Sequence, residues 1–211
     1  MGKLKLPSLW IEYEVKSRDG KVLDKGKVES QTWVGNIVAL ISSLLAHWGI
    51  TSQTNLYYLR TRADILDTTD TARDTMLPVY TNSPVGGAAP AGNTDAGILV
   101  GSSDAPVTIN QYNLINLITH GSGQGQLQYG ETTVDPLVKG STWTLRIIRT
   151  FTNASGATVT VKEFGLFIRL GTRDSPYTYS AMLARDVPPS PVNVPNGSTL
   201  TLRYIISHSI S

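Results

Sequence analysis

The pattern of hydrophobic and polar positions follows the two-residue period of β-strands over most of this chain. It is clearest at residues 199–210, TLTLRYIISHSI, where Leu200, Leu202 and Tyr204 alternate with polar side chains. Residues 9–30 alternate in the same way on both sides of an Asp-Gly pair at 19–20, which supplies the positive φ angles of a tight turn. They are predicted to form an N-terminal β-hairpin.

The period changes to three and four residues in one segment. Apolar side chains between 32 and 48 fall on one face of a helix, and Gly49 can end that helix in a left-handed cap. We therefore predict one inserted α-helix, about 32–48, whose two tryptophans pack in the core. Polar residues interrupt the segment, and it is shorter than the roughly 20 residues of a membrane span.

The remaining chain is predicted to form further strands, with two breaks in the alternation. At Ile147-Ile148 the period shifts, which predicts a bulge or a strand buried on both faces. At Glu163 it shifts again, inside one long strand predicted for residues 158–170. This succession of strands predicts a mainly β chain, in which residues 1–211 form a single antiparallel, jelly-roll-like β-sandwich domain.

Residues 83–97, SPVGGAAPAGNTDAG, offer little side-chain area to bury, and their prolines disfavour helix and strand pairing. A structureless loop of this length inside a compact domain is usually functional or disordered. Small side chains let the backbone lie flat on a neighbouring subunit, so we predict an extended intersubunit arm here and a second arm at residues 1–8. The candidate arm residues are Pro84, Gly86, Gly87, Pro90 and Gly92.

Composition narrows the function classes. Charged residues make up 16% of the chain, against roughly 25% in an average soluble protein, and the net charge is only +2. A charge so small and dispersed predicts neither nucleic acid nor a membrane as a partner. The absence of cysteine excludes a disulfide and a thiolate metal site. The first 15 residues lack the apolar run of a secretory signal, so export by that route is not expected.

No local motif predicts catalysis, and no cofactor is expected. The histidines, His47, His120 and His208, have no metal-ligand spacing. Residues 64–74 carry four aspartates but lack the alternating ligands around a glycine that a calcium loop needs, which favours an ion-pair face over a cation site. Residues 121–125, GSGQG, precede no helical pattern and are predicted to form a turn rather than a phosphate loop.

A glycosidase would need two carboxylates facing each other across a substrate. Glu12 or Glu14 could pair with Glu131 or Glu163 in space, but their spacing along the chain does not indicate it. A hydrolase is therefore the third interpretation.

A carbohydrate- or receptor-binding module would need exposed aromatic side chains on one face. Tyr177 and Tyr179 share one side of a predicted strand and are the leading candidates, while an interface or half-buried position is the commoner place for a strand tyrosine. The further candidates are Tyr57, Tyr58, Tyr112 and Tyr129.

Three C-terminal stretches carry a family resemblance. They are VTVKEFGLFI, AMLARDV and PVNVPNGSTLTLRYII, with an acidic-apolar-Gly-apolar kink at residues 163–166, an Ala-Arg strand, a proline-rich turn and a Thr-Leu-Thr strand. These resemble the C-terminal strands of small virion proteins of tailed phages and related viruses, which are tail, fibre or head-accessory components. GILVGSSDAPVTINQYNL and GQLQYGETTV are similar to the same group. The resemblance covers roughly the C-terminal half and implies no catalytic residues.

The expected function is that of a structural virion protein, which self-assembles in many copies as a tail, capsid-accessory or filament component without catalysis. Its expected partners are copies of itself and other virion proteins. We expect assembly in the host cytoplasm and residence in the virion. The alternative is a carbohydrate- or receptor-binding β-sandwich module of a virus particle.

Overall fold

The computed structural model describes residues 8–30, 87–139, 142–172 and 175–209, with the backbone alone at 136–139, 170–172, 175–179 and 208–209. These residues form ten strands and no helix, so none of them belongs to a helix that could cross a bilayer. The predicted helix at 32–48, the aspartates at 64–74 and residues 1–7 of the arm predicted at 1–8 lie outside the described residues, whereas Ser8 begins the first strand. The strands are β1 (Ser8–Lys16), β2 (Val22–Glu29), β3 (Gly97–Gly101), β4 (Gln128–Lys139), β5 (Thr142–Thr152), β6 (Val159–Val161), β7 (Glu163–Thr172), β8 (Ser175–Asp186), β9 (Val192–Val194) and β10 (Thr199–Ser209).

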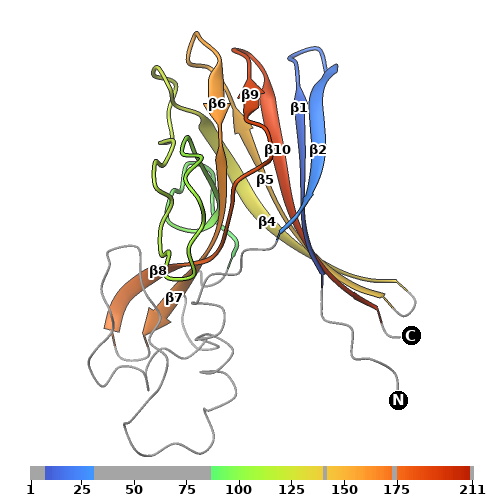
Figure 1. Ribbon diagram of the computed structural model, residues 1–211. Coiled ribbons are helices and arrows are strands. Elements are labelled where there is room, and N and C mark those ends of the chain that lie inside the picture. The colour runs from blue at the N-terminus through green and yellow to red at the C-terminus, as the bar shows by residue number, and fades with distance from the viewer. Residues whose placement is uncertain (1–7, 31–86, 140–141, 173–174, 210–211) are drawn as a thin grey trace, which may run out of the picture.

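The strands form three antiparallel sheets. The largest has the order β2-β1-β10-β5-β4, the second has the order β3-β7-β8, and β6 pairs with β9 alone. The first and last strands of the chain are neighbours, because β1 pairs with β10 along its whole length. In Figure 1 the five-stranded sheet forms one layer and β7 and β8 curve away from its lower end.

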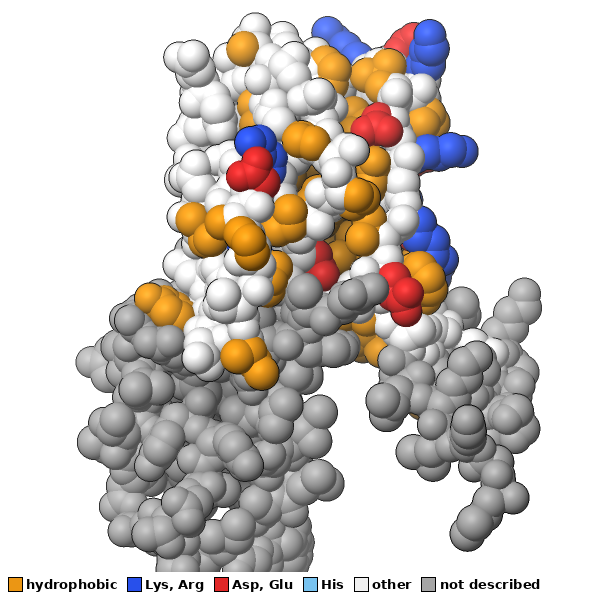
Figure 2. All heavy atoms as spheres, viewed as in Figure 1, with side chains coloured by type: hydrophobic (Ala, Val, Ile, Leu, Met, Phe, Trp, Pro, Cys, Tyr) orange, Lys and Arg blue, Asp and Glu red, His pale blue; other side chains and the backbone are white. Residues whose placement is uncertain are grey.

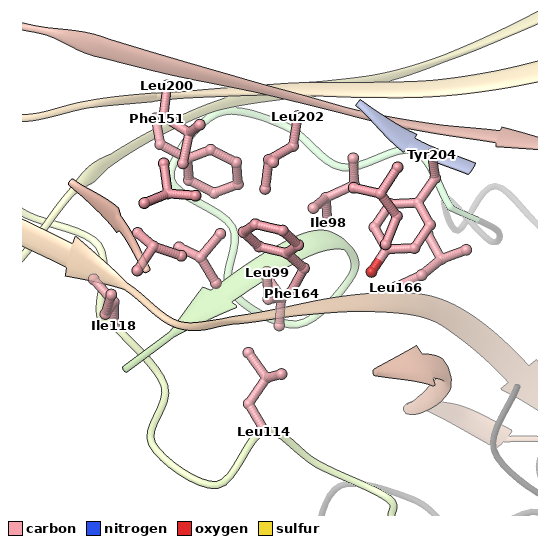
Figure 3. Packing of buried hydrophobic residues seen from close by; sticks show 14 of the residues in the cluster. Ile98, Leu99, Leu114, Ile118, Phe151, Phe164, Leu166, Leu200, Leu202 and Tyr204 are labelled. Carbon is pink, nitrogen blue, oxygen red and sulfur yellow. The ribbon is translucent and has the colours of Figure 1, made fainter. Parts of the chain in front are cut away.

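The hydrophobic core lies between the five-stranded sheet and the β3-β7-β8 sheet. Figure 3 shows Phe151 and Leu202 from the large sheet facing Ile98 and Phe164 from the other, and all four side chains are fully buried. The prediction of a mainly β chain with antiparallel sheets is thus confirmed. The jelly-roll arrangement stays a prediction.

The N-terminal hairpin is confirmed. β1 and β2 pair antiparallel, and Gly20 occupies the turn with a φ of +85°. The Ser17 amide closes this turn by donating to the Lys21 carbonyl at 2.9 Å. β10 also has the predicted alternation, since Leu200, Leu202 and Tyr204 are all buried.

The prediction of a bulge or a strand buried on both faces at Ile147-Ile148 is wrong. β5 keeps an unbroken register with β10 through these residues, and the outward side chains of Arg146, Ile148 and Thr150 are not buried. Ile147, Arg149 and Phe151 all face the core. The apolar pattern shifts because a fully buried arginine occupies an inward position and Ile148 faces outward.

The single strand predicted for 158–170 is also wrong, because the chain changes sheet within it. β6 ends at Val161 and pairs with β9, whereas β7 begins at Glu163 and pairs with β3 and β8. The shift in hydrophobic phase at Glu163 marks this transfer between sheets.

We predict that Gly97→Ala destabilises the fold more than Gly156→Ala. Both glycines have a φ near +80°, where a Cβ costs about 1–2 kcal/mol. A Cβ at Gly156 meets open space, whereas one at Gly97 overlaps the Thr132 side chain and adds about 1–3 kcal/mol of overpacking. Urea unfolding measures both variants, and equal losses would contradict the packing at Gly97.

Candidate interaction surface

Arg149 is a fully buried cation on the inner face of β5. Its guanidinium lies over the ring of Tyr129, 4.8 Å from the centroid. Burial lowers its pKa to about 10, so the group stays charged at neutral pH. It donates hydrogen bonds to the carbonyl oxygens of Gly130 at 2.9 Å, Ala96 at 3.1 Å, Ile98 at 3.0 Å, Asn93 at 2.6 Å and Pro90 at 3.4 Å.

These bonds hold the described part of the predicted arm against its own chain. Ala89 and Thr132 exchange two backbone hydrogen bonds, the Pro90 carbonyl accepts from Arg149, and the Gly92 amide donates to the Tyr129 carbonyl at 2.9 Å. A Cβ on Gly87 would touch Val134 at 4.0 Å. Candidates Pro84 and Gly86 lie outside the described residues, and the intersubunit role of the arm stays a prediction.

A second buried arginine fixes the loop of residues 102–119. Arg185 of β8 and Glu163 of β7 form an ion pair at 2.6 Å, and both side chains are wholly buried. The Glu163 carboxylate accepts from the amides of Ile115 at 3.2 Å and Asn116 at 2.9 Å. The guanidinium donates to the Ala105 carbonyl at 2.9 Å. The pair therefore replaces strand pairing for a loop that has little of its own.

The 102–119 loop displays apolar side chains while packing others inward. Leu114 and Ile118 are buried in the core, but Ile109 is 71% exposed and Ile115 is 54% exposed. No Asp, Glu, Lys or Arg occurs among the 26 residues from 105 to 130. Figure 2 shows charged side chains concentrated toward β1 and β2, whereas the side carrying this loop is mostly apolar or neutral.

A second apolar surface lies where the described strands of the β3-β7-β8 sheet no longer cover the inner face of the five-stranded sheet. Along β5, Phe151 and Ile147 are buried, Leu145 is half-buried and Trp143 is 61% exposed. Leu145 pairs with Ile206, and Val134, which is 40% exposed, pairs with Ile147. We call Val134, Trp143, Leu145 and Ile206 the uncovered strip. Figure 1 shows this end of β4 and β5 diverging from β7 and β8.

A third buried group joins the two sheets. The Tyr204 hydroxyl donates to the Asp186 carboxylate at 3.1 Å, and the Ser30 hydroxyl donates to the same carboxylate at 2.8 Å. Burial and the nearby charge of Asp186 raise the pKa of Tyr204 well above its ordinary value. These two hydrogen bonds tie the end of β2 to β8 and β10.

The candidate catalytic and metal-binding residues do not converge in the described part of the chain. Glu12 contacts Lys27 at 3.2 Å and Glu14 contacts Lys16 at 2.8 Å, whereas Glu163 lies in the interior. Glu131 is exposed on β4, which β10 and β5 separate from β1, so the sheet does not place it beside Glu12 or Glu14. His120 accepts a backbone hydrogen bond, and His47 and the side chain of His208 lie outside the described residues. No group of three potential metal ligands occurs where side chains are described.

The candidate tyrosines are likewise not brought together on one described face. Tyr129 is a core residue, because its hydroxyl donates to the Ile118 carbonyl at 2.6 Å and only 2% of it is exposed. Tyr112 is half-buried in the 102–119 loop. Tyr177 and Tyr179 lie in β8, where the structure describes the backbone alone. Tyr57 and Tyr58 lie outside the described residues. The aromatic binding face stays a prediction.

The sequence analysis missed Arg149, Arg185 and the exposure of Trp143. The signal for Arg149 was present, since a lone arginine interrupts an alternating apolar face at the inward position. The signal for the ion pair was the acidic residue at the second phase shift. Exposure of Trp143 had no local signal, because it depends on how far the other sheet reaches.

A comparison of the chain with protein-family models, curated proteins and solved structures finds no match.

We predict that Arg149→Met lowers the free energy of unfolding by about 3–5 kcal/mol, because it leaves buried carbonyl groups without donors. Arg146→Met is the matched control on the outer face of the same strand. Arg146 pairs with Asp135 on a partly exposed surface, so its loss is expected to cost less than about 1 kcal/mol. Urea unfolding compares the two, and amide exchange at residues 89–98 should accelerate in the Arg149 variant alone. Similar losses of unfolding free energy in the two variants would contradict the role of Arg149 in holding residues 89–98.

We predict that Tyr204→Phe reduces the loss of stability at alkaline pH. The folded-state pKa of Tyr204 lies above the ordinary value of 10, so its stabilising contribution is complete below pH 10 and is lost as pH rises through the folded-state pKa. At pH 7 the free energy of unfolding of the variant is lower by about 1 kcal/mol, because the substitution removes the hydrogen bond to Asp186. The difference in free energy of unfolding between the variant and the wild type should become smaller as the pH is raised from 9 to 12. A difference that stays constant over this range would contradict the prediction.

Proposed function

We propose that this chain is a structural virion protein that self-assembles in many copies, as a tail, capsid-accessory or filament component, and performs no catalysis. The observation that carries the proposal is the uncovered strip, in which a tryptophan on the core face of a sheet is 61% exposed. A core-type face that ends in solvent is typical of a subunit whose packing is completed by another molecule.

Burial of the strip's apolar side chains favours association. Burying one large apolar side chain is worth about 1.5–3 kcal/mol, and the strip offers Trp143 and Val134 together with the half-buried Leu145 and Ile206. Interfaces of many copies use such patches with few charged groups at their centre. The ionisable side chains of the described strip region, Arg146 and Asp135, pair on the opposite face of the sheet.

The buried charges support a structural role over a catalytic one. Arg149 and the Glu163–Arg185 pair donate to, or accept from, backbone groups of connecting segments. They are used to shape the surface. Facing antiparallel sheets support the jelly-roll-like sandwich that we include in this proposal, and the C-terminal resemblance supports other virion proteins as partners. Assembly in the host cytoplasm and residence in the virion are parts of the same proposal.

We predict that the purified protein forms multimers whose mass rises with concentration, and that Trp143→Ser weakens them. The loss of one large apolar contact should raise the concentration for half-assembly about tenfold or more. Light scattering over a concentration series measures the mass, and electron microscopy identifies rings, tubes or lattices.

Val22→Ser is the matched control, because Val22 is 41% exposed but lies on the hairpin strand β2, away from the strip. It should assemble as wild type does. A wild-type chain that stays monomeric at every concentration would contradict self-assembly. Equal effects of Trp143→Ser and Val22→Ser would show that the strip has no specific role in assembly.

A further inference from the structure

We propose that assembly is head-to-tail: the 102–119 loop of one copy, through Ile109 and Ile115, binds the uncovered strip of the next copy. This inference rests on the proposed function and names the two surfaces that meet. An interface between two different patches propagates, closing into a ring or continuing as a filament according to the rotation between copies.

The loop has the rigidity that a binding surface needs. The Glu163 carboxylate accepts directly from the Ile115 amide, and the Arg185 guanidinium donates to Ala105 and, at 3.3 Å, to the Gln111 side chain. Burying an ion pair carries a large desolvation cost and adds little net stability, so its effect here is to define one loop conformation. A loop fixed before binding loses less conformational entropy on association.

The chemistry of the loop fits a protein surface. Its most exposed large side chains are the isoleucines at 109 and 115 rather than an aromatic ring, since Tyr112 is half-buried, and residues 105–130 contain no Asp, Glu, Lys or Arg. An uncharged apolar patch with amide side chains around it matches the centre of a protein interface. The partner surface must therefore also be apolar and free of charge.

The uncovered strip has that character and lies where a neighbour can reach it. Its side chains are Val134, Trp143, Leu145 and Ile206. By contrast, the β1–β2 hairpin carries the ion pairs of Glu14 with Lys16 and of Glu12 with Lys27. Figure 1 shows the green loop on one side of the molecule and the end of β4 and β5 extending to the other. Two patches so placed cannot meet within one chain, but they can meet between successive copies.

Cysteine cross-linking tests the contact, since the wild-type chain contains no cysteine. Thr108→Cys labels the exposed loop beside Ile109, and Val134→Cys labels the strip while keeping Trp143. Each variant, their equimolar mixture and the double variant are treated with a short bis-maleimide and resolved by denaturing electrophoresis. Leu23→Cys, 45% exposed on β2, is the matched control.

Head-to-tail contact predicts three results. Either single variant alone stays monomeric on the gel, the mixture gives dimers, and the double variant gives a ladder of multimers. Dimers in one single variant would overturn the proposal in favour of a symmetric contact. So would a ladder equally strong with Leu23→Cys in place of Val134→Cys.

The failure of this inference is distinct from failure of self-assembly. Multimers in light scattering without loop-to-strip cross-links would overturn the contact and leave the proposed function standing. A Val134→Cys thiol that resists maleimide in a monomer would overturn the contact too, because the strip would then be buried within its own chain. Ile109→Ser/Ile115→Ser should raise the half-assembly concentration at least tenfold with unfolding unchanged, and unaltered assembly would overturn the proposal.

Discussion

Two connecting segments without regular pairing, residues 87–96 and 102–119, depend on guanidinium groups buried beneath them. A backbone carbonyl or amide that leaves water must find a hydrogen-bond partner, and strands supply that partner only within a ladder. Arginine offers five donors in a fixed plane, so one side chain can serve several carbonyls at once. Arg149 serves the first segment and Arg185, with Glu163, serves the second.

The two arginines meet the cost of burial differently. Arg185 is neutralised by a carboxylate, which itself accepts from loop amides, so both charges are used on the same loop. Arg149 is balanced by carbonyl dipoles and by the ring faces of Tyr129 and Phe151. Each side chain lies on a core strand, and the loops are therefore positioned by the sheets rather than by their own packing. This explains how long irregular segments can present a defined surface.

The sequence predicted the strands correctly where one face of a strand carries only apolar side chains. The alternation in β10 and the Asp-Gly turn of the hairpin depend on neighbouring residues alone, and both were predicted correctly. The interior charges were not, because a hydrophobicity pattern counts Arg149 and Glu163 as surface residues and shifts its phase around them. Their partners lie 51 residues away at Ile98 and 22 residues away at Arg185, and nothing local records such a contact.

Strand length explains why the uncovered strip could not be predicted. β5 and β10 have 11 residues each, about 36 Å of strand, whereas β3 has five and β9 has three. Alternation continues along β5 to Trp143 as if the core continued, because the sequence specifies which side a residue faces and not what lies opposite. Among the described residues, the short β3 and the departing β7 and β8 do not cover that end of the sheet. A sheet longer than its cover must expose its apolar face or share it, and sharing it with another molecule removes the cost.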